Sequence, residues 1–99
     1  MADPEATPQT LEAQRTLAVT NKLGIHARPA AMIVRVANKY KADVIVEKED
    51  EQVSAKSIMG LMMLAAGHGT ELRFSATGEQ AEALLEEMQA LFDRKFEET

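Results

Sequence analysis

Four short segments of this chain predict strands, three because apolar positions alternate along them and the fourth because of the apolar run Val44-Ile45-Val46. Leu17 and Val19 lie on one face of the first segment, as Leu72 and Phe74 do in the last. The predicted strands span residues 15–20, 43–48, 52–55 and 71–76. A polar run, Glu49-Asp50-Glu51, separates the second strand from the third and predicts a hairpin.

Hydrophobic residues recur every three or four positions in two longer segments, which predicts amphipathic helices. The first helix runs from residue 27 to about residue 39 and presents one apolar face made of Ala30, Ile33, Val34 and Ala37. Pro29 falls in its first turn, and the residue before a proline disfavours helical angles, so we expect an irregular start at Arg28. The last helix is predicted from Ala81, Leu84, Leu85, Met88, Leu91, Phe92 and Phe96.

A short apolar segment, residues 58–66, predicts one more helix. Ser57 is a favoured N-cap, and Gly67 and Gly69 are favoured C-terminal stops. The predicted order is therefore β-α-β-β-α-β-α. This order favours an α+β fold with one four-stranded antiparallel sheet and three helices on one face. We expect residues 1–14, which contain Pro4 and Pro8, to be a flexible extension, and residues 15–99 to form one domain.

Composition excludes several classes of protein. The 99 residues are 45% hydrophobic but only 4% aromatic, so the core must be mainly aliphatic. The absence of cysteine fits a reducing compartment. No apolar run approaches the roughly 20 residues that cross a bilayer, and residues 1–14 do not resemble a secretory signal. We therefore expect a cytoplasmic protein with no membrane insertion.

Charge is distributed unevenly along this acidic chain, whose net charge is −5. Between Glu12 and Asp43 every charged residue is basic: Arg15, Lys22, Arg28, Arg35, Lys39 and Lys41. This segment suits anionic groups or acidic partners, although a solvated basic helix face would look the same. Nucleic acid is not expected, because the basic cluster is short and Tyr40 is its only nearby aromatic residue.

His26 stands where the loop at residues 21–25 passes into the first helix. An ordinary polar cap or an exposed histidine without a task would explain its position. A metal site is poorly supported, since His68 is the only other histidine and there is no cysteine, and we expect neither metal nor cofactor. No nucleophile elbow supports Ser-His-Asp hydrolysis either.

Phosphoryl transfer is the more specific hypothesis for His26. A phosphoryl group on its ring would meet free backbone N–H groups and the positive end of the helix dipole. The amides of Ala27 and Arg28 would lie nearest, and the Arg28 guanidinium could donate to phosphoryl oxygens.

The segment from Ile58 to Leu64 is apolar nearly all round, which is more than a short helix buries on one side. We expect some of Met59, Met62 and Met63 to face solvent and to provide an adaptable binding surface. The alternative is that all three lie in the core.

Two motifs resemble one known family. Residues 23–31, with His26-Ala27-Arg28-Pro29, resemble the phosphorylation site of HPr, the histidine-containing phosphocarriers of the bacterial phosphoenolpyruvate:sugar phosphotransferase system. Residues 54–61 resemble the regulatory serine segment of the same family, in the same order and spacing. The resemblance covers about residues 15–96 and implies an HPr-like open-faced β-sandwich.

The resemblance also implies roles. Enzyme I would phosphorylate His26 at Nδ1, an EIIA-type domain would accept the group, and Arg28 would steady it. Partners would dock on the second helix, at Ile58, Met59 and Met62, with Arg35 contributing from the first helix. We expect a monomeric carrier with no independent turnover, and so not an enzyme.

Ser57 has two interpretations. It can be a simple N-cap, or it can match the serine that HPr kinase/phosphorylase modifies, in which case phosphate would oppose binding of an acidic partner. Two functional alternatives stay open at this point: the nitrogen-related branch of the same family, and a regulatory binding module controlled through Ser57.

Overall fold

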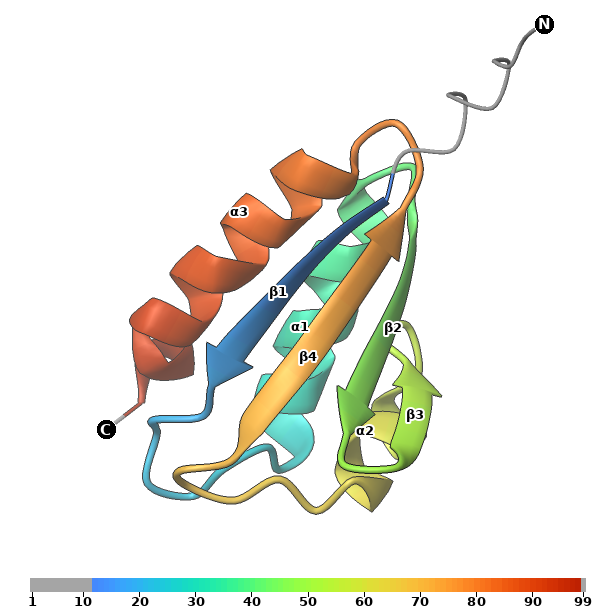
Figure 1. The fold of residues 1–99 in the computed structure, drawn as a ribbon. Coiled ribbons are helices and arrows are strands. Elements are labelled where there is room, and N and C mark those ends of the chain that lie inside the picture. The colour runs from blue at the N-terminus through green and yellow to red at the C-terminus, as the bar shows by residue number, and fades with distance from the viewer. Residues whose placement is uncertain (1–11, 99) are drawn as a thin grey trace, which may run out of the picture.

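The computed structural model describes residues 12–98. Its four strands form one sheet in the spatial order β1-β4-β2-β3, and every neighbouring pair is antiparallel (Figure 1). The strands are β1 (Glu12–Ala18), β2 (Asp43–Lys48), β3 (Glu51–Ser54) and β4 (Glu71–Thr77). The predicted hairpin is present, since Lys48 pairs with Glu51 across the turn.

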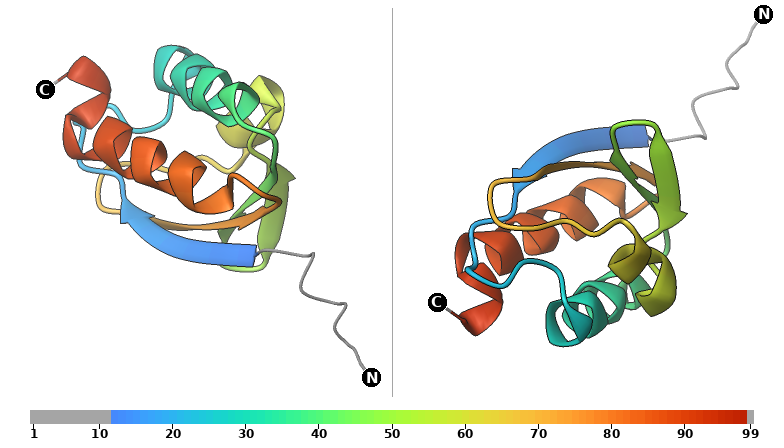
Figure 2. Two further views of the ribbon diagram at one scale, coloured as in Figure 1. Left: turned by 90° about the horizontal axis from the view of Figure 1, so that it is seen from above. Right: turned by 90° about the horizontal axis from the view of Figure 1, so that it is seen from below.

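The helices cover one face of this sheet and leave the other face open, as the two views of Figure 2 show. They are α1 (Ala27–Lys39), α2 (Ile58–Met63) and α3 (Ala81–Asp93), and the short 3-10 turn η2 (Lys95–Glu97) follows α3. The predicted α+β class, with three helices on one face of a four-stranded antiparallel sheet, is confirmed.

The core lies between the sheet and the helices. Alternation in β4 points Leu72, Phe74 and Ala76 into it, and all three are fully buried. The core is mainly aliphatic, as predicted, but it also contains Phe92 and Phe96. The Phe92 ring packs edge-on against Phe74, with centroids 5.5 Å apart, and against Phe96, with centroids 4.7 Å apart.

Several predicted boundaries are wrong. β1 begins at Glu12, three residues before the predicted strand, because Glu12 pairs with Thr77 and extends the ladder. The predicted extension thus loses residues 12–14 to the sheet, and the rest of it lies outside the described residues. α2 ends at Met63, because Ala65 takes a left-handed φ of 53°.

The two long helices also differ from expectation at one end each. α1 is helical from Ala27, so the irregular start predicted at Arg28 is not observed. Pro29 is tolerated there because the N–H groups of a first turn have no partner within the helix. α3 stops at Asp93, and the chain then turns left-handed at Lys95 (φ 54°), Phe96 (φ 55°) and Glu97 (φ 61°).

No helix within residues 12–98 combines the length and the apolar character that crossing a bilayer requires.

Candidate functional site

His26 is the N-cap of α1, as predicted, with extended backbone angles (φ −90°, ψ −168°). Its carbonyl accepts the first hydrogen bond of the helix from the Ala30 amide at 3.0 Å. The imidazole does not cap its own helix, and 38% of the side chain is exposed. The ring is therefore held at the helix start and stays accessible from solvent.

The loop before His26 is held in place by backbone contacts. Gly24 has a φ of 73°, and a Cβ atom there would lie 2.6 Å from the Ala66 carbonyl oxygen. This position therefore requires glycine. The next residue, Ile25, is buried and donates its N–H to the same Ala66 oxygen at 2.9 Å. These contacts determine where the first turn of α1 begins.

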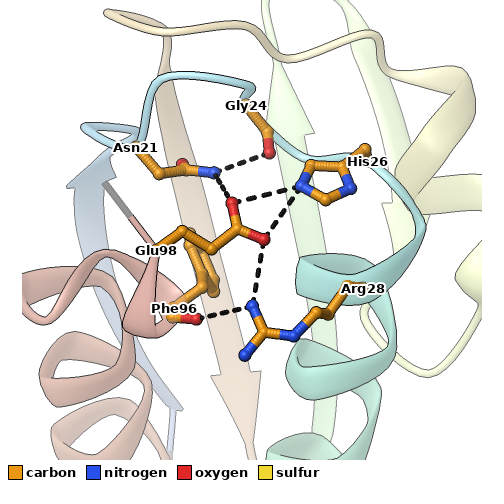
Figure 3. A network of polar contacts seen from close by, with 6 residues as sticks. All are labelled: Asn21, Gly24, His26, Arg28, Phe96 and Glu98. Atoms are coloured by element: carbon orange, nitrogen blue, oxygen red, sulfur yellow. Dashed lines mark hydrogen bonds and ion pairs between the residues drawn. The ribbon is translucent and has the colours of Figure 1, made fainter.

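Glu98, at the far end of the chain, lies beside His26 although 72 residues separate them (Figure 3). Its two carboxylate oxygens lie 3.0 and 3.1 Å from His26 Nε2. The carboxylate also accepts hydrogen bonds from Arg28 Nη1 at 3.0 Å and from Asn21 Nδ2 at 3.1 Å. Three donors from the start of α1 and its preceding loop thus converge on one carboxylate.

These contacts lower the pKa of the Glu98 carboxyl. The hydrogen bond with His26 is the main cause that holds the pKa of the Glu98 carboxyl below its ordinary value of 4.5, and the bonds from Asn21 and Arg28 act in the same direction. The carboxylate is therefore ionised at neutral pH. Charge-assisted hydrogen bonds of this kind are among the stronger ones in proteins.

Sequence reasoning missed Glu98 and Asn21. Glu98 is one of many acidic residues in the C-terminal part of the chain, and no spacing relates it to His26. Asn21 is a polar loop residue in the sequence, yet its side chain is fully buried and donates to the Gly24 carbonyl at 2.8 Å. The left-handed turn that brings Glu98 to the site follows from tertiary packing, so no local pattern predicts it.

The predicted phosphate-binding groups do lie together at the start of α1. The amides of Ala27 and Arg28 belong to the first turn, where backbone N–H groups have no partner within the helix. Ala27 is exposed and small, so it leaves the approach open. Arg28 contacts the C-terminal segment through Nη1 alone, which donates to Glu98 and to the Phe96 carbonyl at 3.1 Å. An anion at this helix start can therefore meet backbone and guanidinium donors.

A second group of predicted residues gathers on α2, which packs beside α1 (Figure 2). Its exposed apolar side chains, called here the α2 patch, are Ile58 (42% exposed), Met59 (72%), Met62 (43%) and Met63 (73%). The expectation that some of these methionines face solvent is confirmed, while Leu61 and Leu64 on the opposite side are buried. Large apolar side chains clustered at the surface are typical of a binding site.

Two more predicted residues lie near these groups. Ser57 caps α2, and its Oγ accepts a hydrogen bond from the Gly60 amide at 2.9 Å. The side chain is half-buried at the edge of the α2 patch. Arg35 is exposed on α1, two helical turns beyond Arg28. The functional roles assigned to both residues stay predictions.

Comparison with known proteins gives one consistent family. Residues 13–94 match the family described as "PTS HPr component phosphorylation site". A relative, phosphocarrier protein HPr of Treponema pallidum, is 43% identical over 85% of this chain and 96% of its own length.

Solved structures agree with this match. The crystal structure of HPr from Thermoanaerobacter tengcongensis superimposes with a TM-score of 0.84 at 39% identity, over 88% of this chain and 98% of that one. A structure described as an HPr dimer from the same organism gives a TM-score of 0.69 at 41% identity, over 79% and 90% of the two chains. The chain thus belongs to the HPr family, the phosphocarrier proteins of the phosphotransferase system.

Proposed function

We propose that this chain accepts a phosphoryl group on Nδ1 of His26 from phosphorylated enzyme I and passes it to an EIIA-type domain. The observation that carries the proposal is the difference between the two ring nitrogens. Nε2 is hydrogen-bonded to Glu98, whereas Nδ1 has no hydrogen-bond partner among residues 12–98. A neutral imidazole with one nitrogen free is a competent nucleophile.

Uptake and delivery of the phosphoryl group each form one nitrogen–phosphorus bond and break another. The Nδ1 lone pair forms a bond to phosphorus while the bond between phosphorus and the donor nitrogen breaks, and its electron pair stays with the donor. We propose that the amides of Ala27 and Arg28 and the free end of the Arg28 guanidinium receive the phosphoryl oxygens; their position at the start of α1 supports this. Passing the group on reverses these steps, so the chain carries phosphoryl groups and has no turnover of its own.

The site is accessible, which suits a carrier that meets two partners in turn. His26 is partly exposed, and the α2 patch lies on the helix that packs beside α1. We propose that this patch, with Arg35, contacts both enzyme I and the EIIA-type domain. Since the proposed donor draws on phosphoenolpyruvate, a cytoplasmic metabolite, we place the reaction in the cytoplasm.

The test is incubation with enzyme I and phosphoenolpyruvate, followed by mass spectrometry and phosphorus NMR at mildly basic pH, where phosphohistidine survives. The wild-type chain and the His68→Ala variant should gain one phosphoryl group, and His26→Ala should gain none. His68 is the matched control because it is the only other histidine and is exposed. Phosphorylation of His26→Ala would overturn the proposal. Comparing the rates of transfer to sugar-type and nitrogen-type EIIA domains then identifies which branch of the phosphotransferase system the chain serves.

We also propose that HPr kinase/phosphorylase phosphorylates Ser57. The support is its place at the edge of the α2 patch, together with the resemblance of residues 54–61 to the regulatory segment of the family. Phosphate would add about two negative charges next to Ile58 and Met59, which would oppose an acidic partner. Incubation with such a kinase and ATP should modify wild type and Ser54→Ala but not Ser57→Ala.

All the side chains of the proposed site come from one chain, and on this ground we propose that the carrier acts as a monomer. Light scattering should give the mass of a single chain at the concentrations used for transfer. A dimer in which His26→Ala and Glu98→Ala chains restore each other's transfer would contradict this.

A further inference from the structure

We propose that Glu98 is a positioning residue for His26: its carboxylate holds the hydrogen on Nε2 and orients the ring so that the Nδ1 lone pair faces the incoming phosphorus. The inference rests on the proposed phosphoryl transfer at His26 and names a residue that the transfer needs. The residue acts on the Nε2 side of the imidazole, opposite the nitrogen that would carry the phosphoryl group. Figure 3 shows this Nε2 side facing the Glu98 carboxylate.

The first step of the argument is the hydrogen position. An ionised carboxylate can only accept hydrogen bonds. Both Glu98 oxygens lie within 3.1 Å of Nε2, so the hydrogen between them belongs to Nε2. A neutral imidazole carries one hydrogen on its two nitrogens, and Nδ1 is therefore left with its lone pair.

The second step is the restraint on Glu98 itself. Its side chain is only 17% exposed, and Asn21 and Arg28 donate to the same carboxylate. Asn21 cannot move freely, since it is fully buried and also donates to the Gly24 carbonyl. The carboxylate is thus a fixed acceptor, not a surface side chain that meets His26 by chance.

The third step is the backbone that delivers Glu98. Lys95, Phe96 and Glu97 all have positive φ, a conformation that residues other than glycine adopt reluctantly. Phe96 holds this turn, because its ring is fully buried against Phe92 and its carbonyl accepts from Arg28. Strained backbone that packing maintains beside a reactive group is a feature of functional sites.

The chemistry gives Glu98 a second effect on the reaction. When neutral His26 takes the phosphoryl group on Nδ1 and keeps its hydrogen on Nε2, the ring becomes positively charged. The carboxylate 3.0 Å from Nε2 stabilises that charge without taking the proton. When the group moves on, the electron pair of the N–P bond returns to Nδ1 and the ring is neutral again.

The test uses the unmodified chain first. Nitrogen-15 NMR of the imidazole at a pH where the ring is neutral should show a slowly exchanging Nε2–H proton in wild type. Glu98→Ala should lose this signal, whereas Glu98→Gln should keep it because the amide oxygen can still accept. Glu97→Ala is the matched control: it removes a neighbouring carboxylate that is exposed and pairs with Arg94. No slowly exchanging Nε2–H proton in wild type would overturn the inference.

The second experiment measures the kinetics of phosphoryl transfer from phosphorylated enzyme I to each variant. A carboxylate that orients a metal-bound histidine typically contributes about 10- to 100-fold to activity. We expect a factor of the same size here, so kcat should fall by about 10- to 100-fold in Glu98→Ala, with KM unchanged. The kcat of Glu98→Gln should lie between those of Glu98→Ala and wild type, because the amide still orients the His26 ring but carries no negative charge. Transfer by Glu98→Ala at the wild-type rate would overturn the inference and leave the proposed function standing, whereas a wild-type chain that accepts no phosphoryl group would overturn both.

Discussion

The Arg28 guanidinium donates through Nη1 to the backbone carbonyl of Phe96 at 3.1 Å, and thereby joins the start of α1 to the end of the chain. The same nitrogen donates to Glu98, while the rest of the guanidinium has no partner among residues 12–98. Arg28 can therefore hold the C-terminal turn and still offer donors to a phosphoryl group on His26.

We expect Arg28→Lys to slow phosphoryl transfer through His26 by roughly 10- to 150-fold, since a hydrogen bond to a charged group contributes about 1.5–3 kcal/mol. Lysine keeps the charge but cannot donate to two groups with one planar fork. Stopped transfer reactions with phosphorylated enzyme I measure the rate. Arg73→Lys, which changes an arginine on β4 that pairs with Glu47, is the control and should transfer at the wild-type rate. Equal rates for both variants would contradict the role of Arg28.

Met59→Gln should raise the KM for enzyme I by roughly fivefold to tenfold and leave kcat unchanged, because the few contact residues that dominate an interface each contribute more than about 1 kcal/mol and Met59 is among the most exposed apolar residues of the α2 patch. Met59 is 72% exposed, so the variant should unfold at the same temperature as wild type. Ile45→Gln is the matched control: Ile45 is an exposed apolar residue of β2, outside the α2 patch, and its loss should not change KM. A higher KM in both variants would show that the effect is not specific to the α2 patch.

Ser57→Ala should lower the free energy of unfolding by about 1 kcal/mol, because the Gly60 amide loses its acceptor at the start of α2. Ser57→Asp should retain most of that stability, since aspartate is an equally good N-cap. Urea unfolding followed by circular dichroism measures both variants. If Ser57→Asp unfolds as easily as Ser57→Ala, capping is not the structural role of this residue.

Acid should destabilise the fold through two carboxylates. Hydrogen bonds from Lys39 and then Tyr40 hold the pKa of Glu87 below its ordinary value of 4.5, and His26 is the main cause of the same effect at Glu98. A lowered folded-state pKa contributes stability above about pH 4.5, and that contribution disappears as the pH falls through the folded-state value.

The stability difference between wild type and Glu87→Gln should accordingly be larger at pH 7 than at pH 3. Thermal unfolding at both pH values, with equal ionic strength, measures it. A difference that is the same at both pH values would show that Lys39 and Tyr40 do not stabilise the ionised form of Glu87.

Ala65→Gly should stabilise the chain by about 1 kcal/mol, because Ala65 follows α2 with a φ of 53°, where glycine has no steric penalty. The same substitution at Ala83, an exposed position inside α3, should cost about 1 kcal/mol. Each variant is the control for the other, because the two changes in the free energy of unfolding should have opposite signs. Chemical denaturation measures both. Destabilisation by Ala65→Gly would contradict the left-handed termination of α2.

The sequence by itself determined the elements and most of the site at α1. Alternation, apolar runs, helical spacing and capping residues are all local properties, so they predicted four strands, three helices and the exposed methionines of α2. His26, Ala27 and Arg28 are neighbours in the chain, and a helix start brings such neighbours together whatever the rest of the fold does.

Only the tertiary structure decided the rest. β1 begins at Glu12 because Thr77 offers a pairing partner there, and the chain after α3 turns left-handed because Phe96 is buried against Phe92. That turn brings Glu98 to His26 across 72 residues. Contacts of this kind depend on packing between distant segments, which no local pattern of hydrophobic and polar residues encodes.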